Sequence, residues 1–274
     1  MFKEPSIRFA AWVACIMMAL FTMLPCIWIL ATAFKTAAEI NLWPPTFLPD
    51  DPTMENFQQL LRETPFMRYV FNSLLIAVGS TLSIMVTSSL AGFVFAKYRF
   101  PLRGLLFTLI LASAVIPLEA YMVPLYIMVF KVHMLNSFAA LIFPLMIMTF
   151  GVFFMRQVIM SIPDELLEAA RIDGASEWWI YLRIILSLSK SGLMAIGVFA
   201  FTQAWANFIW PLAVVSSGDM YTTELGLAEF QRAFFTEYGP IAAGAVISIV
   251  PMLIVFALLR RHIMQGIATS GMKG

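Results

Sequence analysis

Charge is the scarcest property of this sequence. Asp, Glu, Lys and Arg make up 12% of its 274 residues, whereas hydrophobic residues make up 61%. Soluble domains carry about 25% charged residues, which cover their surface. The composition therefore excludes an ordinary soluble globule and indicates a polytopic membrane protein. The formal net charge of +1 gives no reason to expect a nucleic-acid partner.

Motifs for catalysis and metal binding are missing as well. The sequence contains no Gly-x-x-x-x-Gly-Lys-[Ser/Thr] phosphate loop and no His-Glu-x-x-His pair. Its two histidines, His133 and His262, lie at opposite edges of the expected membrane, which argues against a membrane hydrolase. Its two cysteines, Cys15 and Cys26, lie about 16 Å apart along one expected helix, too far for a disulfide. We therefore expect no catalytic residue and no metal site in this chain.

Six long stretches are nearly free of charge. They are continuous rather than alternating, which favours an all-α protein with six transmembrane helices over a strand barrel. Each supplies the roughly 20 residues that a membrane-spanning helix needs. The first is longer than the apolar core of a signal peptide, so we expect it to be retained. The six expected spans cover residues 9–34, 70–96, 105–130, 134–155, 191–216 and 238–259.

Basic residues set the expected orientation, because cytoplasmic loops carry an excess of Lys and Arg. Twelve of the 17 Lys and Arg residues lie before residue 9, in 97–104, in 156–190 or after residue 259. Both termini and the long loop 156–190 are therefore expected in the cytoplasm. The opposite loop, 35–68, is rich in proline and is expected to form an irregular cap with a short helix near 54–62.

One ionisable residue, Glu119, lies well inside an expected span. Pro117 and Pro124 are expected to break or kink this helix, because proline lacks the N–H that a helix uses. Two interpretations of Glu119 follow. Its carboxylate lines a solute pathway, or it faces a water-filled vestibule at a broken turn.

The cytoplasmic loop 156–190 carries the strongest local pattern. Ser161 is expected to cap a helix that Gly174 ends, since glycine readily adopts the left-handed conformation of a C-cap. Ser176 is expected to cap a second helix, in which Trp178 and Trp179 suit a membrane interface. The spacing predicts an apolar face on the first helix, made of Ile162, Leu166, Ala169 and Ala170.

Two functions suit this first helix. It could lie on lipid headgroups, or it could dock to a partner protein. Its polar face is mainly acidic, whereas helices that lie on a membrane surface favour Lys and Arg. The acidic face therefore favours docking to a partner.

A family resemblance rests on the same loop. Glu168-Ala169-Ala170-x-x-x-Gly174, followed by Ile184-x-Leu186, resembles the EAA loop of ABC importer permeases. The run 161–176 is similar to the version in carbohydrate-type importers, such as the second membrane subunit of maltose, multiple-sugar or glycerol-phosphate systems. Further similar segments are Phe34-Lys35-Thr36, Glu39-Ile40, Asn72-Ser73-Leu74, Leu90-Ala91-Gly92-Phe93, Ala96-Lys97, Ile116-Pro117, Pro124-Leu125-Tyr126, Trp210-Pro211-Leu212 and Gly271-Met272-Lys273-Gly274.

Two positions depart from the family pattern. Ser187 stands where the family usually has a proline after Leu186, so a softer bend is expected there. The common Trp-Asn-Asp of the fifth helix is Trp205-Ala206-Asn207 in this chain, which weakens any role assigned to an acid at this position but not the expected fold.

The resemblance implies a type I ABC importer permease fold, in the cytoplasmic membrane of a bacterium or archaeon. It implies four kinds of partner: a homologous second permease subunit, an ATP-binding cassette ATPase dimer, an extracytoplasmic solute-binding protein and the lipid bilayer. ATP and Mg²⁺ would bind the ATPase, so no cofactor is expected in this chain. The residues implied to couple the chain to the ATPase are Asp164, Glu165, Glu168, Ala169, Ala170, Asp173, Gly174 and, in the tail, Lys273.

The implied solute is an oligosaccharide, a sugar or a related polyol. Sugar sites combine aromatic faces with polar edges, although such aromatic residues are often packing or interface residues instead. An ion-coupled secondary transporter that acts without an ATPase is the alternative function. The candidates for a solute path are Glu119, Tyr121, Gln203, Trp205, Asn207 and Trp210.

Overall fold

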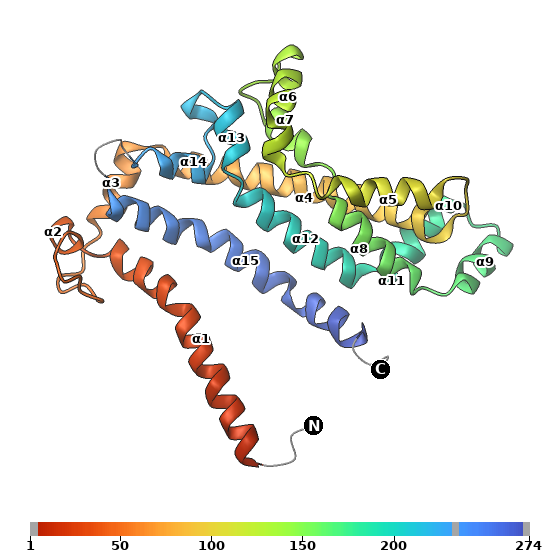
Figure 1. Cartoon of the computed structure of the whole chain (residues 1–274), viewed down its shortest axis with the longest axis horizontal. Helices are drawn as coiled ribbons and strands as arrows, with labels where there is room; N and C mark the ends of the chain where they lie inside the picture. The colour runs from red at the N-terminus through yellow and green to blue at the C-terminus, as the bar shows by residue number, and fades with distance from the viewer. Residues whose placement is uncertain (1–4, 232–235, 271–274) are drawn as a thin grey trace. The chain divides into compact units, whose positions relative to one another are not determined.

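The computed structural model describes residues 5–231 and 236–270 and is built almost entirely from helices. Within these residues, extended pairing is limited to an isolated antiparallel bridge between Gln231 and Thr236. The expected all-α class is therefore confirmed, and Figure 1 shows the order of the helices.

In chain order the elements are α1 (Pro5–Ala33), α2 (Ala37–Ile40), α3 (Glu55–Glu63), α4 (Phe66–Lys97), α5 (Arg103–Ser113), α6 (Leu118–Lys131), α7 (Phe138–Ile142), the 3-10 helix η1 (Phe143–Leu145), α8 (Thr149–Met160), α9 (Asp164–Ile172), α10 (Glu177–Trp179), the π-helix η2 (Ile180–Ile185), α11 (Leu186–Leu188), α12 (Lys190–Trp205), α13 (Ile209–Val214), the 3-10 helix η3 (Gly218–Met220), α14 (Thr223–Ala228) and α15 (Tyr238–Ser270).

Three uninterrupted helical segments are long and apolar enough to cross a membrane: Ala11–Ala33, Phe66–Lys97 and Tyr238–Arg260. Three further pairs meet that test only together, and each pair is bent. The bend is 96° between α5 and α6, 48° between α7–η1 and α8, and 79° between α10–α11 and α12. The described residues thus hold three candidate spans, or up to six when each bent pair counts as one. Two of the bends lie inside the expected spans 105–130 and 134–155, whereas the third lies at Ser189, just before the expected span 191–216.

Pro117 explains the sharpest of these bends. Proline has no N–H and disfavours helical geometry in the residue before it. α5 accordingly ends at Ser113, and Pro117, whose ψ of 150° is extended, directly precedes α6. The predicted break at Pro117 is confirmed, whereas Pro124 lies inside α6 without ending it.

The chain divides into two compact units. The first contains residues 1–67 and 226–250, and the second contains residues 68–225 and 251–274. The loop 156–190 therefore belongs entirely to the second unit.

Buried polar contacts fold the loop after α1 within the first unit. Asn56 Nδ2 donates to the carbonyl oxygens of Ala33 and Lys35 at 3.0 and 2.7 Å. The Glu39 carboxylate accepts a hydrogen bond from the backbone N–H of Asp50 at 2.7 Å. The loop is therefore ordered although it is irregular, and the short helix expected within it is confirmed as α3.

Close packing characterises the second unit around the loop 156–190. Met155 and Ile159 of α8 are fully buried in one cluster with Ile180 and Ile185 of η2. Gly92 of α4 meets α8 so closely that a Cβ at this position would lie 2.8 Å from the Met155 Cβ. A larger residue would force these helices apart, so the packing gives α9 a rigid base.

Candidate coupling site

The start of α9 is fixed by the last residue of α4, Lys97. Its ammonium group donates to the Ile162 carbonyl oxygen and to Asp164 Oδ1, the latter at 2.6 Å. The Lys97 side chain is 5% exposed, whereas that of Asp164 is 73% exposed. The hydrogen bond and charge of Lys97 hold the pKa of Asp164 below its usual value.

The predicted cap of α9 is wrong. The Ser161 hydroxyl donates to the Val158 carbonyl oxygen at 2.7 Å, so it satisfies the end of α8 instead of the start of α9. Pro163 occupies the position before α9 and offers no side-chain hydrogen bond. The chain therefore needs two residues more than predicted to turn from α8 into α9.

The predicted apolar face of α9 does not coincide with its buried face. Leu167 and Ala170 are the residues of α9 that are buried, with 1% and 9% of their surface exposed. Leu166 and Ala169, which were predicted to share one face with Ala170, are exposed, with 46% of the Leu166 surface accessible. The reason is the later start of the helix. Ile162 is buried but precedes α9, so it does not share the helical period that the prediction counted from it.

Gly174 ends α9, as predicted, with a φ of +85°. The Gly174 N–H donates to the Arg171 carbonyl oxygen at 3.0 Å, and the Ala175 N–H donates to the Ala170 carbonyl oxygen at 2.9 Å. These two bonds form a Schellman motif, in which the residue at positive φ is usually glycine. The direction of the chain after α9 is therefore set by backbone geometry.

An ion pair closes the bend between α9 and α10. Arg171 Nε and Nη2 donate to the two carboxylate oxygens of Glu177 at 2.7 and 3.2 Å, in the bidentate arrangement that fixes orientation best. The Tyr98 hydroxyl donates to the same carboxylate. Ser176 caps α10, as predicted, because its Oγ accepts from the Trp179 N–H at 3.3 Å. These contacts join α4, α9 and α10 around the bend.

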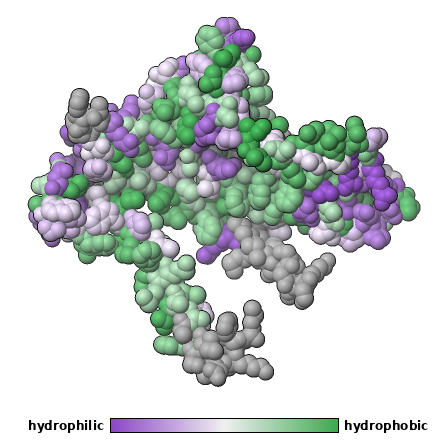
Figure 2. All heavy atoms as spheres, viewed as in Figure 1, coloured by the Kyte–Doolittle hydropathy of each residue, from purple (hydrophilic) through white to green (hydrophobic). Residues whose placement is uncertain are grey.

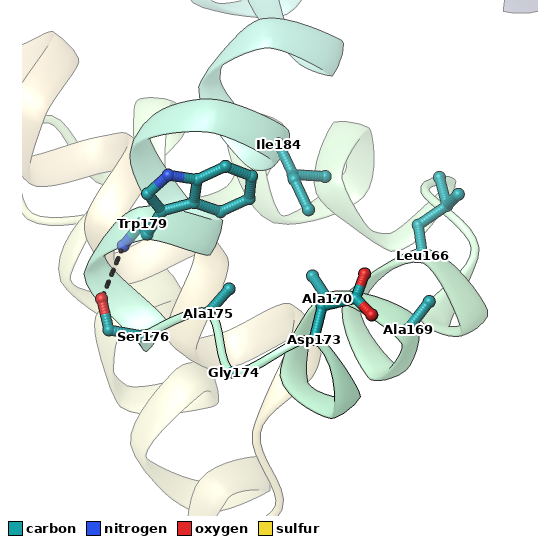
Figure 3. Close-up of a pocket in the computed structure, with 9 residues that line it drawn as sticks. All are labelled: Leu166, Ala169, Ala170, Asp173, Gly174, Ala175, Ser176, Trp179 and Ile184. Atoms are coloured by element: carbon teal, nitrogen blue, oxygen red, sulfur yellow. Dashed lines mark hydrogen bonds between the residues drawn. The ribbon is translucent and has the colours of Figure 1, made fainter.

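An open groove of about 640 Å³ lies at this bend. Figure 3 shows Trp179 and Ile184 on one side of it and Leu166 and Ala169 on the other. Figure 2 shows hydrophilic side chains gathered over α9 and α10, whereas the surface of α5 is hydrophobic. The full lining is Leu166, Ala169, Ala170, Asp173, Gly174, Ala175, Ser176, Trp179 and Ile184. Because most of these side chains are small, a partner could approach the backbone closely.

The structure brings only some of the predicted coupling residues together. Those that line the groove are Ala169, Ala170, Asp173 and Gly174. Those that are exposed on α9 outside the groove lining are Asp164, Glu165 and Glu168. Lys273 lies outside the described residues.

Several contributors to the site were not predicted for these roles. Five residues outside the predicted coupling set line the groove: Leu166, Ala175, Ser176, Trp179 and Ile184. Ala175 and Ser176 directly follow Gly174, which was the available signal. Lys97 and Tyr98 position α9 and α10 across 67 and 79 residues of chain. No local sequence pattern predicts a contact over such a separation.

The predicted solute-path residues have different environments. Trp205 and Trp210 are buried in two separate hydrophobic clusters of the second unit. The Trp205 ring stacks on Phe201 at 5.7 Å, and Trp210 Nε1 donates to the Ala140 carbonyl oxygen at 2.9 Å. Both indole rings therefore have packing roles within this chain. The other candidates are Glu119, Tyr121 and Gln203, which are exposed, and Asn207, which is half-buried.

The apolar helices, three pairs of them bent, indicate a multi-pass membrane protein, and the groove beside α9 is a candidate surface for a partner. The family described as binding-protein-dependent transport system inner membrane component matches residues 84–265. The chain belongs to this family. It is accordingly a permease subunit of an ATP-driven importer and not an ion-coupled carrier that acts alone.

Individual relatives agree with this assignment. The chain is 32% identical over 259 residues to the arabinooligosaccharides transport system permease protein AraQ of Halalkalibacterium halodurans. The aligned region covers 93% of each chain. It is 32% identical over 240 residues to the sn-glycerol-3-phosphate transport system permease protein UgpE of Escherichia coli, covering 85% of each. A bacterial ABC transporter involved in the import of the acidic polysaccharide alginate has the same fold, with a TM-score of 0.80 and 18% identity, covering 95% of this chain and 99% of that one.

Proposed function

We propose that this permease takes up a carbohydrate: an oligosaccharide, a sugar or a related polyol. The relatives that cover most of the chain are named for arabinooligosaccharides, lactose and sn-glycerol-3-phosphate, all of which carry several oxygen-bearing carbons. Within this chain, the polar side chains of Glu119, Tyr121, Gln203 and Asn207 are available for hydrogen bonds to such a solute. A ligand screen on the partner solute-binding protein identifies the solute.

The proposed topology is one permease domain over residues 1–274, with six spans and both termini in the cytoplasm of a bacterium or archaeon. Three long helices and three bent pairs supply enough apolar length for six crossings. The excess of Lys and Arg in the segments assigned to the cytoplasm supports the orientation. This topology leaves α9 and its groove on the cytoplasmic side.

The proposed partners are a homologous second permease, an extracytoplasmic solute-binding protein and an ATPase dimer that holds ATP and Mg²⁺. The ATPase seats on α9, and the observation that carries this assignment is the open groove at the Gly174 bend. Ala169 and Ala170 allow close approach, while Glu168 and Asp173 offer carboxylates to the partner. The exposed Asp164 and Glu165 extend the acidic surface, and the tail around Lys273 is a further proposed contact.

The contacts of α9 indicate how force would pass into the membrane. Lys97 fastens the start of α9 to α4, and the pair formed by Arg171 and Glu177 fastens its end to α10. A helix held at both ends transmits a push from a docked ATPase instead of absorbing it. Closure of the ATPase dimer would then favour one of the two access states, as coupling requires.

Filling the groove tests this assignment. Ala169→Trp places an indole in the groove, and Ser187→Trp places one on an exposed position of α11 outside it. We expect Ala169→Trp to lower recovery of the ATPase with this chain at least tenfold, since central interface positions contribute about 2 kcal/mol or more. Ser187→Trp should leave recovery unchanged.

A charge reversal provides a second, independent test of ATPase docking. Glu168→Lys keeps the groove open but reverses an exposed carboxylate, and it should also reduce ATPase recovery. Membrane insertion and thermal stability of each variant report on folding. If Ala169→Trp folds normally and retains the ATPase as the unmodified chain does, the docking proposal is wrong.

A further inference from the structure

A second groove, of about 400 Å³, lies between the end of α4 and the start of α10. Phe93 and Tyr181 line it with rings stacked at 5.8 Å, and both side chains are otherwise buried. Val94 and Trp178 also line it and remain 41% and 66% exposed. The volume falls within the usual range of small-molecule sites. The groove is therefore an aromatic recess with apolar walls open to the surroundings.

The groove has one cation without a hydrogen bond or ion pair. Arg99 lines it, is exposed, and makes neither contact with the residues that the structure describes, although its charge helps to lower the pKa of Asp164. The carboxylate of the groove, Glu177, is by contrast already bound by Arg171 and Tyr98. The neighbouring Lys97 is bound as well, to the Ile162 carbonyl oxygen and to Asp164 at the start of α9. The recess therefore offers apolar surface together with one exposed positive charge that is not bound in an ion pair.

We propose that this groove binds an anionic phospholipid of the cytoplasmic leaflet. The acyl chain lies against Val94 and Trp178, and the phosphate lies at Arg99. Basic pockets beside transmembrane helices attract anionic headgroups, and exposed tryptophan is favoured at the membrane interface. A free phosphate ion would reach only Arg99 and leave the apolar walls in water, so the recess favours a lipid. This inference rests on the proposed position of 156–190 at the membrane and not on the solute.

Lipid in this groove would act on the coupling site. Glu177 and Trp178 begin α10, directly after the bend that follows α9. A bound lipid contacts the α10 side of that bend and holds it against α4. The proposed site therefore makes the geometry of the ATPase-docking groove depend on anionic lipid.

Fluorescence quenching by brominated lipids tests the site. The chain, purified with its partner permease and ATPase, is reconstituted in phosphatidylcholine vesicles that contain a small fraction of acyl-brominated phosphatidylglycerol. A parallel sample contains the same fraction of brominated phosphatidylcholine. The signal of Trp178 is the difference between the unmodified complex and the Trp178→Phe variant. We expect phosphatidylglycerol to be preferred about fivefold, as one surface cation provides.

Two arginine variants make the result specific. Arg99→Gln should remove the preference, whereas Arg183→Gln, which removes an exposed arginine of η2 outside the groove, should preserve it. Equal quenching by both lipids, or a preference that survives Arg99→Gln, overturns the lipid site. Excess inorganic phosphate should not abolish the preference; if it does, the site is an anion site and the proposal is wrong.

The same measurement separates this inference from the proposed function. Equal quenching by both lipids leaves residue 178 at the membrane and removes only the lipid site. Quenching by neither lipid overturns the lipid site and also the position of 156–190 at the membrane. ATPase recovery with Ala169→Trp is measured separately, so failure of docking is recognised by itself.

Discussion

The Lys97 ammonium that ends α4 lies 2.6 Å from the Asp164 carboxylate that begins α9. One partner is almost wholly buried and the other is mostly exposed, so the contact links the interior of the second unit to the surface proposed to meet the ATPase. Lys97 also donates to the Ile162 carbonyl oxygen, which fixes the backbone just before α9. Movement of α9 therefore requires α4 to move with it, or this contact to break.

Replacing Lys97 should release the start of α9. Lys97→Met removes the ion pair and the bond to Ile162, and hydrogen bonds to charged groups contribute about 1.5–3 kcal/mol. We expect amide hydrogen exchange over 162–168 to accelerate, with little change in the interior of α8. Arg183→Gln is the matched control, because it removes an exposed basic residue of the same loop that is not among the groups that shift the pKa of Asp164. Equal acceleration in both variants would contradict the role of Lys97.

The same pair predicts a pH dependence. The pKa of Asp164 is lowered by Lys97, so the pair contributes stability that is fully present above the unfolded value of about 3.9 and is lost as pH falls through the folded value. The Tm difference between the complex and its Asp164→Asn variant should thus be constant from neutral pH to about pH 4 and shrink below it. A difference that changes between pH 8 and pH 5 would point to another group.

Gly174 should tolerate few replacements because of its backbone conformation. An added Cβ would meet no atom within 4 Å, so strain at a φ of +85° is the whole cost. We expect Gly174→Ala to lower stability by about 1–2 kcal/mol and Gly174→Asn to lower it less. Gly218→Ala is the matched control, since its Cβ is equally unobstructed and its φ is not positive. Thermal unfolding of the purified complex measures all three.

The sequence was sufficient to predict features with a local cause. Pro117 breaks a helix by its own covalent structure, Gly174 ends one by its own freedom, and Ser176 caps the residues that follow it. The helical class follows from long apolar runs, which need no knowledge of packing. Each of these predictions is confirmed because the physical cause lies within a few residues of its effect.

Features that depend on distant contacts were missed. The start of α9 is decided by Lys97, which lies 67 residues before Asp164, and the prediction from Ser161 considered only the local cap. The error in the start then shifted the expected face, which combines the exposed Leu166 and Ala169 with the buried Ala170. Burial of Trp205 was equally beyond a single sequence, because aromatic residues serve both solute binding and packing.

Trp210 provides a test of whether a buried tryptophan serves solute binding or packing. Its side chain is fully buried, and its Nε1 donates to the Ala140 carbonyl oxygen at 2.9 Å. Trp210→Phe leaves that buried oxygen without this donor, so we expect a loss of about 1–3 kcal/mol in stability. The KM for the solute should stay unchanged, because the ring packs within the chain. Trp178→Phe, at an exposed ring, should change stability by less than about 0.5 kcal/mol. A raised KM with unchanged stability would instead indicate that Trp210 contacts the solute.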